Sequence, residues 1–363
     1  MTGMRRLLDI RLWACCIAML GLATQGLAQV SLQDQGSSAT VEDGAATSLQ
    51  RNVPGDGSAD HVNDLQLEQY YVAVDGADPV SIGSLGDVST DEQTGNSVTQ
   101  SVSDGVISVS VTYSLTGNPY GYTRDGDASD DTNTMATSVT VSSADGGTHS
   151  VVLYDYIDLA LTDIIVAANG QPIGFEPGID EAASLTLSGG TVVGATQWET
   201  QPNNPDLGGT AEITIVQRAD ITGDVQVTSA DLAAILNAWA QNVPEGEGPD
   251  LVSDGTVNAF DLAQVLSNWA SNSAPSSAEV SSGGGLAGRI ESGGGLSGNA
   301  AVDPDGIQTG EDIEVAFSWS RSVGPGNSLT IEKWLVVTPE PSSIALLGVG
   351  MALLAARFRR PSR

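Results

Sequence analysis

The chain has 363 residues, with 45 aspartates and glutamates against 13 lysines and arginines, which gives a formal net charge of −32 at pH 7. Only six of the basic residues lie between positions 29 and 338, and such an acidic surface repels nucleic acids and anionic lipids, so nucleic acid is not an expected partner. The two cysteines, Cys15 and Cys16, lie near the start, which leaves the rest of the chain without a disulfide, a thiol nucleophile or a cysteine-ligated metal.

Residues 1–28 have the pattern of a secretory signal peptide. Three arginines open the segment, an apolar run extends from Leu12 to Leu22, and small residues precede the expected cleavage after Ala28. The sequence therefore predicts export. Residues 29–66 are polar, and we expect them to be disordered.

Polar and apolar residues alternate along 107–113, 211–215 and 313–319, and five further stretches are candidate strands. Alternation with a period of two, rich in β-branched and aromatic residues and interrupted by Gly, Asp and Asn turns, is typical of antiparallel strands with one buried face. The pattern predicts a mainly β fold, an antiparallel β-sandwich built from residues 67–217 and 301–338. The expected strands are 69–74, 107–113, 137–143, 149–156, 191–199, 211–215, 313–319 and 328–337.

Three groups of side chains in the predicted sandwich are candidates for chemistry, and each also has a structural interpretation. An acidic loop suggests either a calcium site or a solvated surface. A carboxylate set suggests either glycoside hydrolysis or chance in an acidic protein. An aromatic set suggests either sugar stacking or core packing. The groups are, in that order, Asp125, Asp127, Asp130 and Asp131; Asp155, Asp158 and Glu176; and Tyr120, Tyr122 and Trp198.

Residues 218–272 contain a duplication with a period of 30 residues. In each copy an aspartate-rich loop precedes apolar residues spaced i, i+3, i+4 and i+7, which predicts a short amphipathic helix. We expect the two helices to cover each other's apolar stripes. The matched positions are Asp220 and Asp250, Asp224 and Asp254, Val227 and Val257, Asp231 and Asp261, Leu232 and Leu262, Ile235 and Val265, Leu236 and Leu266, and Trp239 and Trp269.

Both loops carry oxygen-bearing residues at the spacing of a twelve-residue calcium loop, which supplies ligands from positions 1, 3, 5, 7, 9 and 12. Val252 supplies no oxygen at position 3 of the second loop. The predicted calcium ligands are Asp220, Thr222, Asp224, the Gln226 carbonyl, Thr228 and Asp231 in the first loop, and Asp250, Asp254, the Thr256 carbonyl, Asn258 and Asp261 in the second. The alternative without metal is a pair of helices capped by Asp231 and Asp261.

The duplicated loop–helix unit resembles the type I dockerin domain. This resemblance implies a small α-helical insertion in the sandwich that binds two calcium ions and docks onto a cohesin-like partner. The repeat departs from the family pattern at Val225, where a glycine is usual, and at Val252. Residues 273–300 are rich in Gly and Ser and predict a flexible linker between this unit and the final strands.

The C-terminal segment 339–363 combines a Pro-Glu-Pro tripeptide, an apolar stretch over 344–356 and an arginine cluster. As a helix the apolar stretch is about 20 Å long, shorter than the ~30 Å hydrocarbon core of a bilayer. The segment resembles the PEP-CTERM sorting signal, which implies recognition by the membrane enzyme exosortase. The residues that carry the resemblance are Pro339, Glu340, Pro341, Arg357, Arg359 and Arg360.

Together these features predict an exported, non-enzymatic protein of the cell surface or extracellular matrix, held transiently or permanently in the membrane by its C-terminal helix. The expected cofactor is Ca²⁺, and the expected partners are exosortase and either a cohesin-like protein or a polysaccharide. The alternative is a carbohydrate-binding or polysaccharide-degrading surface protein.

Overall fold

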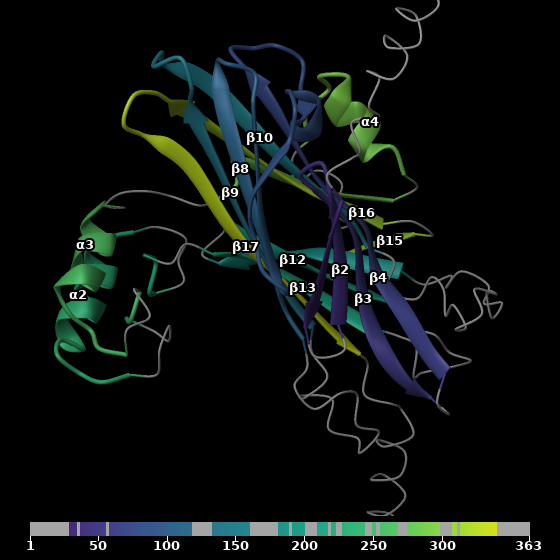
Figure 1. The fold of residues 1–363 in the computed structure, drawn as a ribbon, viewed down its shortest axis with the longest axis horizontal. Coiled ribbons are helices and arrows are strands. Elements are labelled where there is room, and N and C mark those ends of the chain that lie inside the picture. Colours follow the sequence, from purple (N-terminus) through teal and green to yellow (C-terminus); the bar gives the residue numbers. More distant parts are fainter. Residues whose placement is uncertain are drawn as a thin grey trace, which may run out of the picture.

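Two antiparallel β-sheets form most of the structure, which is a computed structural model (Figure 1). The part of the chain that it describes also contains three α-helices and one short 3-10 helix, η1 (Ile82–Ser84). The fold is therefore mainly β, as predicted. The described residues are 29–34, 37–55, 58–117, 133–159, 181–188, 191–199, 209–216, 219–222, 227–243, 249–251, 255–267, 274–282, 284–297, 307–310 and 313–339.

The first sheet, sheet A, has eight strands. Seven follow the spatial order β1-β2-β3-β4-β10-β16-β14, and β5 pairs with β4 beside this path. The strands are β1 (Val30–Asp34), β2 (Ser37–Glu42), β3 (Ala45–Gly55), β4 (Ser58–Val74), β5 (Val80–Ser81), β10 (His149–Leu159), β14 (Ser277–Ser282) and β16 (Ile313–Val323).

The second sheet, sheet B, has nine strands in the order β15-β11-β12-β13-β17-β9-β8-β7-β6. All eight expected strands are present in the two sheets. The strands of sheet B are β6 (Ser89–Gln93), β7 (Ser97–Ser103), β8 (Ile107–Thr116), β9 (Asn133–Ser143), β11 (Glu181–Ser188), β12 (Thr191–Glu199), β13 (Gly209–Val216), β15 (Ile307–Gly310) and β17 (Ser328–Pro339).

The two sheets share one hydrophobic core, which makes the architecture sandwich-like. Alternate residues of the strands point inward, so that Val109 and Val141 of sheet B belong to the same buried cluster as Leu153, Phe317 and Trp319 of sheet A. The rings of Phe317 and Trp319 lie 6.1 Å apart. Aromatic side chains bury about 150–250 Å² each when they are removed from water.

A tight turn between β2 and β3 adds polar links between the sheets. Asp43 and Gly44 have φ values of 50° and 79°, the left-handed pair of an Asp-Gly hairpin turn. A side chain at Gly44 would collide with Ile82, because a Cβ atom there would lie 2.8 Å from its Cδ1. The Gly44 N–H donates to Gln100 Oε1 at 2.7 Å, and the Gly44 carbonyl accepts the Tyr113 hydroxyl at 3.0 Å.

The helices α2 (Ser229–Asn237) and α3 (Ala259–Ser267) are inserted in the chain between β13 and β14. Strands on either side of this insertion pair with one another, since β17 lies beside β13 and β16 lies beside β10. Figure 1 shows the two helices to one side of the sheets. The chain thus leaves sheet B, forms the helix pair, and returns in sheet A.

The expectation that residues 29–66 are disordered is wrong for most of that segment. Strands β1, β2 and β3 and the first part of β4 occupy it. Their inward positions, such as Val30, Leu32, Val41 and Leu49, are buried, whereas serine, threonine and glutamine stand between them. Short polar side chains lower the overall hydrophobicity of such a segment, but one apolar face is sufficient to attach it to the core.

The expectation of a flexible linker over residues 273–300 is also wrong. Strand β14 pairs with β16, and the helix α4 (Leu286–Glu291) lies on the outer face of sheet A (Figure 1). Leu286 and Ile290 are buried there against three tyrosines of β4 and β10. The glycines supply turns, and the two Gly-Gly-Leu sequences supply the apolar side chains that anchor the segment. These tyrosines are Tyr71, Tyr154 and Tyr156.

Two buried glutamates fix the segment that contains α4. Glu314 accepts the Tyr156 hydroxyl at 2.6 Å and the Leu286 N–H at 2.8 Å. Glu279 forms an ion pair with Arg289 and accepts the Ser297 N–H at 2.7 Å. Hydrogen bonds from a backbone N–H to a buried carboxylate stabilise a chain segment more than bonds between neutral groups.

We predict that Ile290→Ala lowers the free energy of unfolding by about 2–5 kcal/mol, because it leaves a cavity between α4 and sheet A. Denaturant unfolding measures this change. The control Ser292→Ala alters an exposed side chain two residues away, and its effect should stay within about 0.5 kcal/mol. Equal effects of the two substitutions would contradict the packing of α4.

Candidate functional site

The helices α2 and α3 form a small pair with its own hydrophobic core. Ile235 and Val265, which occupy equivalent positions of the repeat, are fully buried, and so are the loop residues Val227 and Val257. The loops are also joined through the backbone, since Ala240 N donates to Val257 O at 2.8 Å. The duplication in the sequence thus corresponds to two similar loop–helix units in contact.

Asp231 closes the first loop onto its helix. Its Oδ2 accepts the N–H of the N-cap residue Thr228 at 2.7 Å, and the Thr228 hydroxyl accepts the Ala230 N–H, which completes a capping box. The other oxygen, Oδ1, accepts the Thr222 N–H at 3.0 Å. Burial raises the pKa of Asp231, but the hydrogen bonds from Thr228 and Thr222 lower it by more, so the net shift of its pKa is downward.

Asp261 has the same role in the second unit. Its Oδ2 accepts the Asn258 N–H at 2.8 Å and its Oδ1 accepts the Leu251 N–H at 2.7 Å. The Asn258 side chain accepts the Phe260 N–H at 2.8 Å, as Thr228 does for Ala230. Each aspartate is therefore the third residue of its helix, from which its carboxylate binds the backbone N–H of the residue that precedes the helix.

The structure places several predicted calcium ligands together. In the first loop the Thr222 hydroxyl lies 3.2 Å from Asp220 Oδ1 and 3.0 Å from Asp231 Oδ1. In the second loop Asp250 is 1% exposed and accepts the Gly255 N–H at 2.9 Å.

Other predicted site residues are separate from these groups or lie outside the described residues. The Thr256 carbonyl accepts the Asn258 side-chain amide at 2.9 Å. The described residues contain no group of three or more His, Cys, Asp or Glu side chains arranged to hold a metal ion. Asp224, Gln226, Asp254, Ala28, Glu340, Pro341, Arg357, Arg359 and Arg360 lie outside the described residues, and Pro339 is the last residue of β17.

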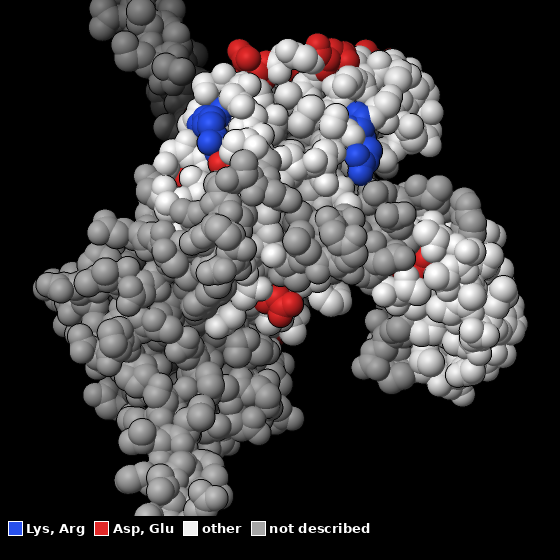
Figure 2. Space-filling view, turned by 180° about the vertical axis from the view of Figure 1, so that it is seen from behind, with Lys and Arg blue, Asp and Glu red and all other residues white. Residues whose placement is uncertain are grey.

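The helix pair exposes four large apolar side chains, three of which belong to the apolar stripes that we expected it to bury. Leu236 and Leu266, at equivalent positions, are 55% and 53% exposed, Trp239 is 44% exposed and Phe260 is 69% exposed. The two nine-residue helices bury Ile235 and Val265 in their shared core, and the edge of each stripe stays uncovered. Figure 2 shows this part of the molecule at the lower right as an almost uncharged surface.

A cluster of charged groups lies in the core between the sheets. Lys333 of β17 has its Nζ 2.6 Å from Asp155 Oδ2 of β10 and 3.2 Å from Glu68 Oε1 of β4. All three side chains are at most 1% exposed. The Tyr70 hydroxyl donates to Glu68 Oε1 at 2.8 Å, and the Lys333 ammonium lies 5.3 Å from the centre of the Tyr70 ring.

Burial controls the protonation of this cluster. Removal from water raises the pKa of Asp155, Lys333 lowers it and Glu68 raises it, and the result is a pKa of about 7. Burial likewise raises the pKa of the Tyr70 and Tyr113 hydroxyls. The second oxygens of the two carboxylates, Glu68 Oε2 and Asp155 Oδ1, are buried without a hydrogen-bond partner.

This geometry separates two members of the candidate carboxylate set. Asp155 points into the core, whereas Asp158 is an odd number of residues further along β10 and points to the opposite face of sheet A. Tyr120, Tyr122, Glu176 and the loop with Asp125, Asp127, Asp130 and Asp131 lie outside the described residues, and Trp198 lies in β12.

Sequence reasoning missed Glu68 and Lys333, although β17 carried a readable signal. Lys333 occupies an inward position of β17, between Ile331 and Leu335, where every other inward residue is apolar. A single charge on the apolar face of an alternating strand indicates a buried ionic partner.

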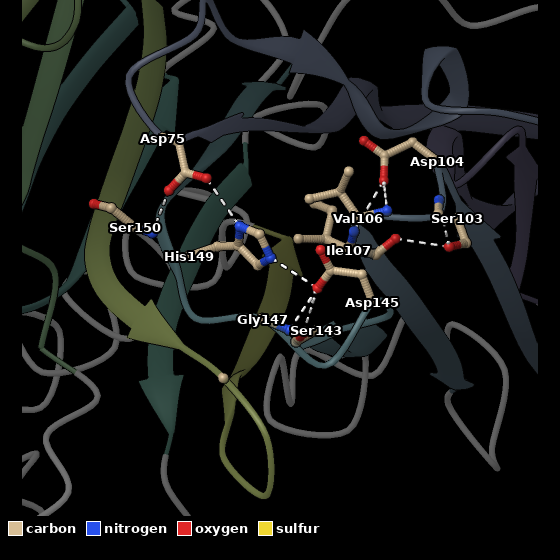
Figure 3. Close-up of polar contacts among 12 residues, drawn as sticks. Asp75, Ser103, Asp104, Val106, Ile107, Ser143, Asp145, Gly147, His149 and Ser150 are labelled. Atoms are coloured by element: carbon tan, nitrogen blue, oxygen red, sulfur yellow. Dashed lines mark hydrogen bonds and ion pairs between the residues drawn. The ribbon is translucent and has the colours of Figure 1, made fainter.

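A second polar group joins two surface turns (Figure 3). His149 Nδ1 lies 2.8 Å from Asp75 Oδ2, and its Nε2 lies 3.0 Å from Asp145 Oδ1. Asp145 also accepts the Gly147 N–H, and Asp75 accepts the Ser150 N–H. With both ring nitrogens bonded to carboxylates, the imidazolium clamps the turn before β10 to the turn after β4.

The hydrogen bonds that the His149 ring donates to Asp75 and Asp145 raise the pKa of His149 above 6.5. The bond from His149, together with those from the Gly147 N–H and the Ser143 hydroxyl, lowers the pKa of Asp145 from 3.8 to about 2. The raised pKa of His149 stabilises the folded state below pH 6.5, and this contribution is lost as the pH rises through the folded value. The lowered pKa of Asp145 stabilises the folded state above pH 3.8, and this contribution is lost as the pH falls toward 2. Both contributions are present between pH 3.8 and pH 6.5.

Comparison with known proteins identifies one motif. Residues 337–360 match the family model of the PEP-CTERM protein-sorting motif, as the tail residues predict, and this motif implies export by the exosortase route. No curated protein sequence matches the chain. None of the helices in the described part of the chain is long and apolar enough to cross a membrane.

Two solved structures are distantly similar. A bacterial glucoamylase in complex with acarbose has 9% sequence identity and a TM-score of 0.40, with 88% of this chain and 35% of that chain covered. A putative aldose 1-epimerase from Escherichia coli K12 has 10% identity and a TM-score of 0.36, with 86% and 99% covered. The chain thus spans about a third of the length of the glucoamylase, and neither similarity bears on its activity.

We predict that Asp145→Asn lowers the pKa of His149 toward 6.5, because the ring loses one of its two carboxylate partners. NMR titration of the imidazole protons measures this pKa. Asp104→Asn serves as the control, since Asp104 binds the N–H groups of Val106 and Ile107 and not the ring. An unchanged pKa in Asp145→Asn would show that the clamp is absent.

Proposed function

We propose that the protein is a non-enzymatic component of the cell surface or extracellular matrix, in which the two sheets present a dockerin-like, calcium-binding helix pair to a partner protein. The observation that carries this proposal is the pair of equivalent loop–helix units closed by Asp231 and Asp261. The sorting motif at residues 337–360 supports the location. The inaccessibility of Asp155 supports the absence of glycosidase activity.

The donor chemistry of the loops fits a calcium ion. Calcium prefers hard oxygen ligands, and the oxygens of Asp220, Thr222 and Asp231 already converge in the first loop. In the second loop the carboxylates of Asp250 and Asp261 are both buried, an arrangement that costs free energy unless charge compensates it. A bound calcium ion would supply that positive charge, and Asp224 and Asp254 would complete the two ligand sets.

The exposed apolar side chains of the helix pair support a role in binding. Four large hydrophobic residues on the two short helices or directly after α2 are more than two-fifths exposed, namely Leu236, Trp239, Phe260 and Leu266. Residues 219–267 contain aspartates and glutamates but no lysine or arginine. An apolar surface with an acidic surround fits a partner whose apolar patch is bordered by basic residues, because such a rim increases the association rate. A cohesin-like protein is the partner class that the resemblance suggests.

We predict saturable binding of about two calcium ions to the chelator-treated full chain, as measured by calorimetric titration. Asp224→Ala and Asp254→Ala should each remove about one of these ions, because each deletes a central ligand of one loop. Asp91→Ala is the matched control, since Asp91 is an exposed acid in β6, outside the repeat, that accepts the Ser89 hydroxyl at 2.9 Å. Identical titrations of the control and both loop variants would refute calcium binding at the repeat.

We also predict that substitution of Glu340 and Pro341 by alanine stops processing of the tail in the native host, because the sorting enzyme then lacks its tripeptide. Fractionation with an antibody against the sheets should show the variant retained in the cytoplasmic membrane. A variant with alanine at Ser342 and Ser343 controls for changes in the tail outside the tripeptide. Normal delivery of the first variant to the surface would refute the sorting role.

A further inference from the structure

The cluster of Lys333, Asp155 and Glu68 has a geometry that a structural ion pair does not require. One ammonium and two carboxylates are enclosed in the core, so the group carries an excess of negative charge away from water. Burial of such charges is costly, and replacement by neutral groups is often stabilising. Glu68 Oε2 and Asp155 Oδ1 also lack hydrogen-bond partners, and buried groups of this kind call for an explanation.

We propose that Lys333 and Asp155 condense to an intramolecular isopeptide bond, with Glu68 as the catalytic proton carrier. The nitrogen nucleophile, the carboxyl group that it attacks and a second carboxylate lie in contact, since Lys333 Nζ is 2.6 Å from Asp155 Oδ2 and 3.2 Å from Glu68 Oε1. The bond would join β17 of sheet B to β10 of sheet A.

The reaction balances without an oxidant or a cofactor. A proton passes from the Lys333 ammonium to the Asp155 carboxylate, which produces a neutral amine and a carboxylic acid. The nitrogen lone pair attacks Asp155 Cγ to form the C–N bond. Glu68 accepts one further proton from this nitrogen and delivers it to the hydroxyl of Asp155, so that the C–O bond breaks and water leaves. The products are one amide and one water molecule.

The surroundings favour each step. The pKa of Asp155, raised to about 7 by burial, makes the neutral carboxylic acid available near neutral pH. Tyr70 donates to Glu68 Oε1 at 2.8 Å and so positions the proton carrier. Reacting groups held in contact reach effective concentrations of about 10⁵–10⁸ M. Exclusion of water from the core then opposes hydrolysis of the product, and the amide removes two buried charges.

Peptide mass spectrometry of the purified full chain tests the proposal. After digestion the segments that contain Asp155 and Lys333 should be recovered as one linked peptide, lighter than the sum of the two by one water molecule. The denatured chain should also migrate faster in gel electrophoresis than its Lys333→Arg variant, because the cross-link prevents full extension. Recovery of the two peptides unlinked from protein with native near-UV circular dichroism would overturn the proposal.

Variants separate the chemistry from the fold. Glu68→Gln retains the nucleophile and the carboxyl group but removes the proton acceptor, and it should slow bond formation by about 10²–10⁴-fold. Asp158→Asn is the control, since it removes a carboxylate of β10 that points to the opposite face of sheet A. It should form the linked peptide as wild type does. Linkage at the wild-type rate in Glu68→Gln would exclude Glu68 from the reaction.

Discussion

The structure depends on the insertion of the last two strands between strands that come earlier in the chain. β16 pairs with β10 and β14 in sheet A, and β17 pairs with β13 and β9 in sheet B. Without β16 and β17 each sheet has a gap in its strand order. The core that both sheets share therefore forms through contacts distant in sequence. Folds dominated by such contacts form slowly. The long excursion through α2 and α3 adds little to this cost, because loop-closure entropy grows only with the logarithm of loop length.

Much of the β fold was predictable because alternation is a local property. Strands such as β8 and β12 begin where the apolar pattern begins. The segments that escaped prediction, 29–66 and 273–300, are rich in small polar residues, and their structure comes from what they cover. Leu286 and Ile290 are buried because Tyr71, Tyr154 and Tyr156 form the surface that they cover. Composition describes the segment alone and does not include that surface.

The candidate sites also combine features that were predictable from the sequence with features that were not. The equivalence of Asp231 and Asp261 was visible as a sequence repeat, because helix caps depend on neighbours a few residues away. The exposure of Leu236 and Leu266 was not, since periodicity indicates the face of a helix but not the width of its contact. The meeting of Glu68, Asp155 and Lys333 was also hidden, because three strands from two sheets bring them together. Spacing along the chain carries no information about such a junction.

The position of the sorting motif has a mechanical consequence. The motif begins at the end of β17, a central strand that forms backbone hydrogen bonds with β9 on one side and β13 on the other. A pulling force transmitted from a membrane-held tail would act along the axis of this strand, and the hydrogen bonds lie perpendicular to it. The bonds to both neighbours would then share the load at once, whereas an edge strand pulled in the same direction would be held by one neighbour only.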